Sequence, residues 1–587
     1  MSEHACAAVQ SERLMGHLRE FARRVKLSGT PEELESFRYL QAQLDGFGYR
    51  TALLSHDAYI SLPGPARLEV DGTPLRCITH SMAMPSPPDG LAGEVVYVGE
   101  ASQAELVGRD LAGRIWLVDG IAGPDVAVRA RAAGARGQIH VSPTEHLYEM
   151  CVSPVWGSPS QHTRAALPNT VIATISRDDG AALRERCQRG ETVTARLWAE
   201  VDTGWRKTPL LVAELDGGDE ADDAPFVLLS GHHDTWHYGV MDNGGANATM
   251  LEAARILADN RPAWRRGLRL CFWSGHSHGR YSGSTWYVDE HWDELDRRCV
   301  AHVNVDSTGG CDATVLTESG VIGALKSVAA DAVRAVAGQD HAGKRQGRNS
   351  DQSFWGLGVP SMFGSISHQE PGPVKMRTPL GWWWHTPHDL IERIDPAFLV
   401  RDTCVVLLAL ERLLQAETLP LDYTVTADAL AAELAALQPH LAARLDIGGL
   451  IAATATLRAH AQAVLDAGST ASPTEARVLN RALMRASRAL VPLDHTSGER
   501  FHHDPALPLN TWASLDGLRE IARLAADSPD LPFFVVHATQ TRNRIAHALR
   551  TAIAALDCLS DPAKESQHGL CRQTPKTSAG QQDSFFE

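Results

Sequence analysis

The sequence predicts an α/β protein whose main sheet is mostly parallel and covered by helices on both faces, with an inserted β-rich module and a helical C-terminal region. Three observations predict this. Short apolar runs alternate with helical stretches after about residue 209. β-rich runs punctuated by Gly and Pro fill residues 93–199. After about residue 420 the chain becomes rich in Ala and Leu and has helical periodicity.

The N-terminal region has the pattern of two amphipathic helices within residues 11–47. Between them, Thr30 suits the N-cap of the second helix and Pro31 its first helical position, where a missing N–H does no harm. Residues 93–199 then alternate β-rich runs at 95–98 and 115–118 with a helix at 126–135. This texture predicts a small module inserted into a larger domain.

The strands of the main sheet are predicted at 226–229, 268–272 and 303–305, with a helix at 246–258 after the first. Such short, nearly continuous apolar runs are typical of strands that are buried on both faces. We therefore divide the chain into the N-terminal part of the α/β domain (1–88), the insert (89–205), the rest of the α/β domain (206–420) and a helical domain with a polar tail (421–587).

Composition narrows the classes of function. The 587 residues carry a formal net charge of -16 that is spread along the chain, which argues against nucleic acid or a membrane surface as a partner. We see no secretory signal, and no stretch reaches the roughly 18 apolar residues that cross a bilayer. The 10 cysteines form no CxxC pair and fit thiols in a reducing compartment, so we expect a cytoplasmic protein.

Histidine and carboxylate side chains follow several of the predicted strands. They are His232 and Asp234 after the first strand with Asp242 shortly beyond, His276 and His278 after the second, Asp306 after the third, and His385 in a later loop. In open α/β sheets, ligands bind at the carboxyl ends of the strands. Imidazole and carboxylate groups are the usual ligands of zinc and similar ions. The sequence therefore predicts a metal site at this edge of the sheet.

These segments resemble the co-catalytic zinc peptidases, a family that includes bacterial aminopeptidases, glutamate carboxypeptidase and the transferrin receptor. The resemblance rests on residues 231–234 with Asp242 and on residues 385–389, and segments 283–286, 304–307 and 350–354 look like further landmarks. It implies a zinc aminopeptidase-like fold, with a protease-associated-like insert. It also implies that the helical domain is a dimerisation domain, and hence a homodimer.

The resemblance also implies roles for individual residues. His232 would bind the first metal ion, Asp242 would bridge two ions, Asp306 would complete the first site, and His385 would belong to the second. Asp234 would orient His232, a common way to fix the tautomer of a ligand. The peptide bond after Asp242 is expected to be cis, as in the family.

The chain departs from the family pattern after the second strand. The family has two adjacent glutamates there, a general base followed by a metal ligand, whereas this sequence has His276 and Ser277. A serine hydroxyl is a weaker ligand than a carboxylate, so the second site loses charge and donor strength. His276 becomes a candidate both for a catalytic residue and for a metal ligand, because neutral histidine can serve as either.

Three hypotheses follow for the function. We adopt a metal-dependent hydrolase that cleaves an amide or peptide-like bond in a small substrate with water activated by one or two ions, zinc being expected. Asp234 and His276 are its predicted catalytic residues. The second hypothesis is a mononuclear enzyme of other chemistry, because His232, Asp242 and Asp306 suit iron or manganese as well as zinc. The third is an inactive binding scaffold, as the transferrin receptor illustrates within the family.

The sequence leaves the substrate open. Arg345 and Arg348 either meet a substrate carboxylate or belong to a solvated loop. The aromatic run 382–384 either lines the site or packs in the core.

Overall fold

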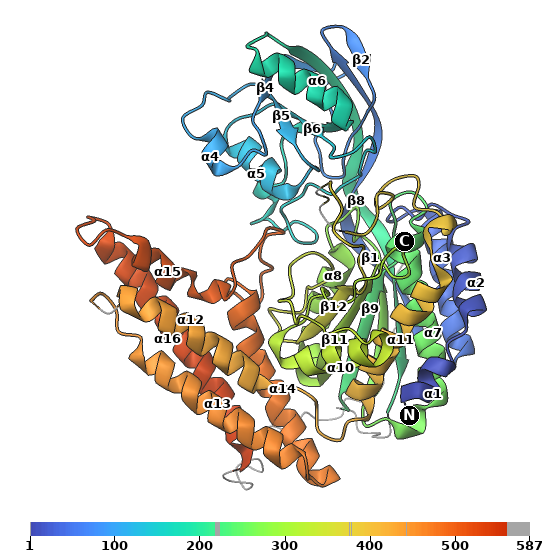
Figure 1. Ribbon diagram of the computed structural model, residues 1–587, viewed down its shortest axis with the longest axis vertical. Coiled ribbons are helices and arrows are strands. Elements are labelled where there is room, and N and C mark those ends of the chain that lie inside the picture. The colour runs from blue at the N-terminus through green and yellow to red at the C-terminus, as the bar shows by residue number, and fades with distance from the viewer. Residues whose placement is uncertain (1, 218–223, 375, 377–378, 442, 560–587) are drawn as a thin grey trace, which may run out of the picture.

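The computed structural model describes residues 2–217, 224–374, 376, 379–441 and 443–559. The polar tail that the sequence predicts at the C-terminal end lies outside these residues. Figure 1 shows three parts: an α/β part at the right, a β-rich part above it, and a group of long helices at the lower left. Among the described helices, none combines the length and the apolar character that crossing a membrane requires.

The α/β part is built on four parallel strands. They are β9 (Phe226–His232), β10 (Gly267–Trp273), β11 (Cys299–Asp306) and β12 (Ser361–Ser365), in the order β12-β11-β9-β10. Strand β8 (Thr194–Leu215) continues the sheet antiparallel to β10, and β1 (Arg50–Val70) pairs antiparallel with β8. The prediction of a mostly parallel sheet is confirmed for these four strands, while β8 and β1 make the sheet as a whole mixed.

Alternate residues of each strand enter two different cores, because successive side chains of a strand point to opposite faces. Val227 and Leu229 pack in one core, and Phe226 and Leu228 pack in the other. The first core contains α2 (Ser11–Phe21), α3 (Pro31–Gly46), α7 (Ala246–Asp259), α10 (Lys326–Ala337) and α11 (Pro396–Gln415). The second contains α8 (Ser282–Glu290) and α9 (Trp292–Arg298). Both faces are therefore covered by helices, as predicted.

The helix starts at the N-terminus also follow the prediction. The short helix α1 (Ser2–Ala7) precedes α2, and α3 begins with Pro31 at its first turn. Thr30 is the N-cap of α3, where its side chain accepts a hydrogen bond from the main-chain N–H of Glu33.

Two long strands carry the chain between the α/β part and the β-rich part. β1 and β8 pair from Arg50 and Glu214 at one end to Val70 and Ala195 at the other. In the β-rich part, β4 (Leu91–Tyr97) pairs antiparallel with β8, and β5 (Ile115–Asp119), β6 (Gly137–Val141) and β7 (Val171–Ile175) follow in parallel. Its helices are α4 (Gln103–Leu106), α5 (Pro124–Ala132) and α6 (Arg177–Gln188).

The packing of the β-rich part begins before residue 89, the predicted start of the insert. Strand β2 (Thr73–Leu75) pairs with the far end of β1, and β3 (Cys77–Ile78) pairs with β7. Leu68 and Val70 of β1 share a hydrophobic core with β5, β6 and β7. The second half of strand β1 therefore belongs to the β-rich part. The composition of this segment alone does not indicate that.

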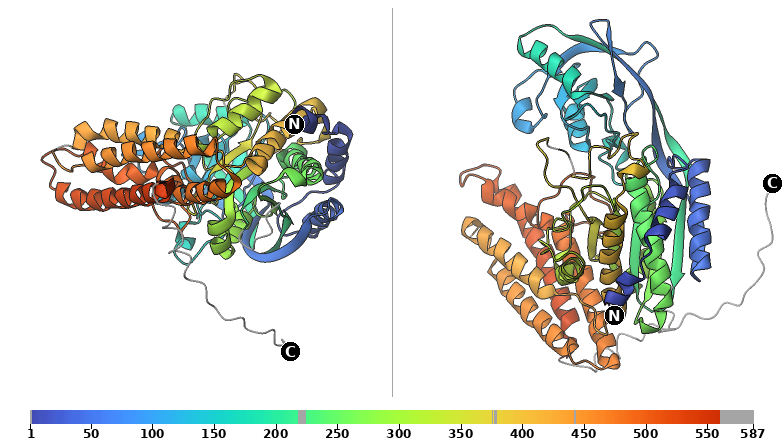
Figure 2. Two further views of the ribbon diagram at one scale, coloured as in Figure 1. Left: turned by 90° about the horizontal axis from the view of Figure 1, so that it is seen from below. Right: turned by 45° about the vertical axis from the view of Figure 1, so that its right-hand side comes forward.

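The C-terminal part consists of long helices that extend away from the sheet (Figure 2). They are α12 (Tyr423–Leu441), α13 (Gly448–Gly468), α14 (Pro473–His495), α15 (Asp516–Arg523) and α16 (Leu531–Leu556). Arg488 of α14 fastens them to the α/β part, because its guanidinium donates to the main-chain oxygens of Leu295, Gly358 and Cys299. Between α14 and α15 the chain returns to the sheet, where the main-chain N–H of Ala506 donates to Pro154 O of the insert.

Candidate metal centre

The carboxyl ends of two neighbouring parallel strands bring His232 and Asp306 together. His232 is the last residue of β9, and Asp306 is the last residue of β11. The register pairs Asn304 with Ser230, so the carboxyl ends of β9 and β11 lie side by side at one edge of the sheet. His232 Nε2 lies 3.8 Å from Asp306 Oδ1. The predicted clustering of these two side chains is thus present.

The His232 ring has a defined tautomer. Its Nδ1 lies 2.8 Å from the main-chain oxygen of Asp234, and a carbonyl oxygen can only accept a hydrogen bond. Nδ1 therefore carries a proton, which leaves the Nε2 lone pair of the neutral ring facing Asp242 Oδ1 at 3.2 Å. His232 is buried, with 2% of its surface exposed.

His385 approaches Asp242 from the opposite side in the same manner. Its Nδ1 donates to the main-chain oxygen of Glu149 at 2.6 Å, and its Nε2 lies 3.1 Å from Asp242 Oδ2. His385 has a positive φ of 59°, in the left-handed region that few residues other than glycine adopt. The loop therefore adopts an unusual backbone conformation where this ring faces the carboxylate.

The contacts around Asp242 need a proton or a metal ion between the facing atoms. Two imidazole lone pairs face two carboxylate oxygens at 3.1 and 3.2 Å, and lone pairs in such contact repel unless a proton or a metal ion lies between them. His232 Nε2 and Asp242 Oδ1 are buried and have no hydrogen-bond partner among the described residues. One oxygen of the carboxylate faces each histidine, which is the arrangement that a bridging ligand needs. The donor set therefore fits one or two divalent ions.

The pKa shifts of His232 and Asp242 are those of a histidine and a carboxylate that stabilise each other's charged forms. Burial alone would lower the pKa of His232, but the carboxylates of Asp242 and Asp306, which would accept from a protonated Nε2, raise it well above its ordinary value. Burial likewise acts to raise the pKa of Asp242, but His232 and His385 hold it below its usual range.

The loop that carries Asp242 is held from two directions. The two oxygens of Asp389 accept hydrogen bonds from the main-chain N–H groups of Met241 (2.8 Å) and Asp242 (3.0 Å). Asn243 accepts from the N–H of Ser307 at 2.9 Å, next to Asp306. The peptide bond between Asp242 and Asn243 is cis, as predicted from the family resemblance.

Asp234 acts differently from the role that the resemblance implies. Its carboxylate lies 3.8 Å from His232 Nδ1, while its main-chain oxygen makes the hydrogen bond to that ring. The carboxylate instead accepts from Ser28 Oγ (2.8 Å) and from the main-chain N–H groups of Ser277 (2.9 Å) and His276 (3.2 Å). It therefore holds the loop after β10 in place.

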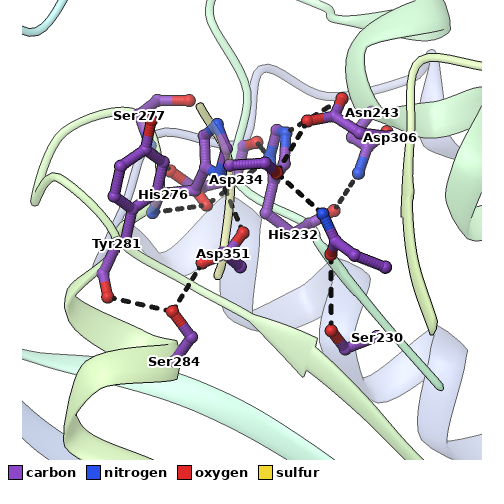
Figure 3. A network of polar contacts seen from close by, with 12 residues as sticks. Ser230, His232, Asp234, Asn243, His276, Ser277, Tyr281, Ser284, Asp306 and Asp351 are labelled. Atoms are coloured by element: carbon purple, nitrogen blue, oxygen red, sulfur yellow. Dashed lines mark hydrogen bonds and ion pairs between the residues drawn. The ribbon is translucent and has the colours of Figure 1, made fainter. Parts of the chain in front are cut away.

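The two residues that replace the family glutamates lie in that loop. The His276 ring stacks on the His232 ring, and ring nitrogens of the two lie within 4.8 Å of each other and of an Asp306 oxygen (Figure 3). Ser277 is buried, and its Oγ has no hydrogen-bond partner among the described residues. His278 turns away, with its Nδ1 3.0 Å from Ser28 Oγ.

A cleft of about 610 Å³ opens over these residues. Its walls come from all three parts of the molecule. Lining residues include Asp242, His276, Asp306 and His385 from the α/β part, Met150 and Cys151 from the insert, and His495 and Leu507 from the C-terminal part. A site between several structural units is a common place for a small ligand.

The structure shows the surroundings of the aromatic and basic residues whose roles the sequence did not decide. Trp384 lines the cleft and stacks on His385 with ring centroids 3.6 Å apart. Arg345 forms an ion pair with Asp494 at 2.8 Å. The guanidinium of Arg348 lies 4.0 Å from the centre of the Trp156 ring, so neither arginine belongs to a freely solvated loop.

Comparison with known proteins agrees with this geometry. The model of peptidase family M28 matches residues 211–410, the segment that contains the whole centre. The chain is thus similar to M28 peptidases over this segment.

Relatives by sequence are peptidases by name. The chain is 26% identical over 280 residues to carboxypeptidase Q of Bos taurus, which covers 45% of this chain and 57% of that protein. It is 27% identical over 202 residues to a glutamate carboxypeptidase 2 homolog of Caenorhabditis briggsae, which covers 34% of this chain and 24% of that protein. The chain thus spans from about a quarter to just over half of the length of these relatives.

Solved structures share the fold. The zinc aminopeptidase of Bacillus subtilis aligns over 70% of this chain and 96% of its own, with a TM-score of 0.55 at 20% identity. The aminopeptidase from Aneurinibacillus sp. strain AM-1 gives a TM-score of 0.54 at 22% identity over the same shares. At such identities the likeness establishes the fold, which is the predicted zinc aminopeptidase-like one.

Sequence reasoning missed three residues that support the centre. Asp351 and Asp389 entered only as members of family-like segments, and Glu149 not at all. Nothing in the sequence pairs Asp351 with His276 or Glu149 with His385, since 75 and 236 residues separate the partners. For Asp389 alone, its position four residues after His385 could have indicated that it lies near the centre.

Proposed function

We propose that this protein is a metal-dependent hydrolase that cleaves an amide or peptide-like bond in a small substrate. The observation that carries the proposal is the position of Asp242 between His232 and His385, with one carboxylate oxygen directed at each ring. Asp306 adds a second carboxylate to the His232 side. The names of the relatives and the family of the domain support the same activity.

Each residue of the centre would have a distinct role. His232, Asp242 and Asp306 would hold a first ion, and His385 with Asp242 would contribute to a second. A divalent ion bound there supplies Lewis-acid chemistry, which polarises a carbonyl group and lowers the pKa of water. Asp234 keeps the loop of His276 against the site through the N–H groups of residues 276 and 277.

The donor set favours a stronger first site and a weaker second one. Two carboxylates and one imidazole meet at the first position, whereas the second has His385, a share of Asp242 and no glutamate. Ser277 occupies the place of that glutamate by resemblance, and a neutral hydroxyl adds no charge. We propose zinc as the ion, with iron or manganese as the alternatives that this oxygen-rich set also suits.

The cleft supports a small or short peptide-like substrate. Its volume of about 610 Å³ lies within the range of sites that take small molecules. Trp384 offers an indole N–H and an aromatic face beside His385. Residues from the insert and from the segment between α14 and α15 close the cleft on two sides and would limit the length of the substrate.

Elemental analysis of the purified protein tests the proposal first. We expect one to two zinc ions per chain, followed by hydrolysis within a panel of dipeptides, aminoacyl-p-nitroanilides and N-acyl amino acids. One iron or manganese ion per chain without hydrolysis of the panel would favour a mononuclear enzyme of other chemistry. A protein that takes up no ion from excess zinc, iron or manganese would favour a binding scaffold and contradict the proposal.

We also propose a cytoplasmic homodimer, with the helices α12–α16 as the contact region and the β-rich insert as a protease-associated-like domain. The exposed side chains of Phe533 and Val536, one turn apart on α16, support a contact there, because apolar groups in contact with water are stabilised by burial. Light scattering after size-exclusion chromatography gives the mass directly. A mass of one chain, 63.6 kDa, at all concentrations would exclude the dimer.

A further inference from the structure

The His276 ring is fixed by a buried aspartate 75 residues further along the chain. His276 Nδ1 lies 2.8 Å from Asp351 Oδ2, and Asp351 is completely buried. The other oxygen of Asp351 accepts a hydrogen bond from Ser284 Oγ at 2.8 Å (Figure 3). An ionised carboxylate only accepts hydrogen bonds, so Nδ1 of His276 carries a proton and Nε2 of the neutral ring keeps its lone pair.

Further contacts leave little freedom to this pair. Ser284 Oγ is also 2.9 Å from Ser353 Oγ, which accepts a hydrogen bond from the indole N–H of Trp156 at 3.0 Å. The edge of the Tyr281 ring packs against the His276 ring, with centroids 4.8 Å apart. The tautomer and the direction of the ring are therefore both set by the surrounding structure.

The orientation of the ring speaks against coordination of the ion held by His232. The two imidazoles lie face to face, with centroids 3.7 Å apart and planes only 12° from parallel. A ring nitrogen binds zinc in the plane of its own ring, at about 2.0–2.1 Å. An ion in the plane of His232 lies well outside the plane of His276, so the two lone pairs do not converge on it.

We infer that His276 is the proton acceptor of the reaction and not a metal ligand, and that Asp351 is the positioning residue that fixes its tautomer. This inference rests on the proposed hydrolase function. As the oxygen of the attacking water forms a bond to the amide carbon, one water proton passes to Nε2 of His276. The same proton then passes to the amide nitrogen as the carbon–nitrogen bond breaks, which releases an amine and a carboxylic acid.

Asp351 supports both stages of this transfer. In the first stage it holds the Nδ1–H tautomer, so that Nε2 is available to accept the proton. In the second stage its negative charge stabilises the positively charged ring that results. The histidine–aspartate pair thus supplies the basic group that the missing glutamate would otherwise provide.

The tautomer can be measured without any metal. In metal-free protein labelled with ¹⁵N-histidine, the His276 signals are identified by their loss in His276→Gln. We expect the Nδ1–H form in the unaltered protein and a shift towards the Nε2–H form, which free histidine prefers, in Asp351→Ala. Asp119→Ala, which removes a carboxylate from the insert that binds Tyr97 and Arg184, should leave the signals unchanged. An Nε2–H form in the unaltered protein would overturn the inference.

Measurements of zinc affinity and turnover distinguish a proton acceptor from a metal ligand at His276. We expect His276→Gln to lower kcat roughly 10²- to 10⁴-fold on the panel compound that the unaltered protein cleaves fastest. We expect Asp351→Ala to lower kcat as well, while KM changes little. Zinc affinity, measured by competition with a chelator, should change less than about tenfold in both variants, because neither residue supports a ligand.

The outcomes distinguish this inference from the proposed function. If the unaltered protein binds zinc and hydrolyses the panel, but both variants lose zinc affinity by about 10- to 100-fold, His276 is a ligand and the inference is wrong. Unchanged kcat in both variants would also refute it. If the unaltered protein binds no zinc and hydrolyses nothing, the proposed function fails first, and the role in proton transfer fails with it.

Discussion

Asp242 Oδ2 lies 3.1 Å from His385 Nε2, and the opposite nitrogen of the same ring donates to the main-chain oxygen of Glu149. The main-chain N–H of Glu149 in turn donates to His385 O at 3.1 Å. Glu149 lies between β6 and β7 of the insert, so the insert fixes one side of the candidate centre directly. The geometry of the candidate centre therefore depends on the contact between two parts of the molecule as well as on the sheet edge.

Removal of the Asp242 carboxylate should abolish metal binding if the proposed site is correct. In Asp242→Ala, both His232 and His385 lose the oxygen that faces them, so we expect zinc content to fall to near zero while the protein remains folded. Zinc per chain by elemental analysis and the far-ultraviolet circular dichroism spectrum check this. Asp293→Ala, at an exposed position of α9, is the control and should retain its zinc. Full zinc content in Asp242→Ala would refute the site.

Asp389 should matter for metal affinity although it faces no ion. It uses both oxygens, one for the N–H of Met241 and one for the N–H of Asp242, so Asp389→Asn directs an amide N–H at a main-chain N–H. We expect zinc affinity to fall by roughly 10- to 100-fold, measured by competition with a chelator.

Asp395 provides a matched comparison for that substitution. One oxygen of Asp395 accepts both N–H groups at the start of α11, so asparagine can replace it without loss of a hydrogen bond. Asp395→Asn should leave zinc affinity unchanged. An equal loss of affinity in both variants would mean that the effect arises from stability and not from the position of Asp242.

The number of zinc ions bound per chain should depend on the side chain at position 277. Ser277→Glu restores a carboxylate at the place where the family has a metal ligand, so we expect the second ion to bind more tightly and the zinc content to approach two per chain. Ser277→Ala should behave as the unaltered protein does, because Ser277 Oγ has no hydrogen-bond partner among the described residues. Titration calorimetry with zinc gives the stoichiometry and both affinities. Identical titrations for the two variants would contradict the assignment.

The protein should lose stability in mild acid because of buried neutral histidines. Burial, and next the charge of His140, lower the pKa of His80 to about 3, and its Nε2 lies 2.7 Å from Thr174 Oγ1. The unfolded chain, with an ordinary histidine pKa of about 6.5, binds a proton more readily than the folded protein. The stability from neutral His80 is therefore complete above pH 6.5 and is lost as the pH falls towards 3. The loss is about 2 kcal/mol at pH 5.

Denaturant unfolding of the metal-free protein at pH 7.5 and pH 5 measures this effect. We expect His80→Gln to reduce the difference between the two free energies of unfolding by about 2 kcal/mol. His162→Gln, at an exposed position, should leave the difference unchanged. A difference in His80→Gln equal to that of the unaltered protein would show that His80 is protonated in the folded state as readily as in the unfolded one.

The sequence by itself determined the strands and helices around the centre and the residues at the strand ends. Residues 226–229, 268–272 and 303–305 lie within β9, β10 and β11 because a short apolar run is a local property, and His232 and Asp306 then end two of these strands. Local sequence did not indicate where the β-rich part begins, because the far half of β1 shares its core with strands further along the chain, as Val70 does with Ile115.

Only the tertiary structure decided which groups orient the site. His276 meets Asp351, and His385 meets the main chain of Glu149. The carboxylate of Asp234 holds the loop after β10, while its main-chain oxygen contacts the His232 ring. Except for the last, each of these contacts joins residues that are distant in sequence. Hydrogen bonds depend on distances of a few tenths of an ångström and on direction, and these are set when the three parts of the chain pack together. A sequence pattern can place a side chain at the edge of a sheet, but not its partner.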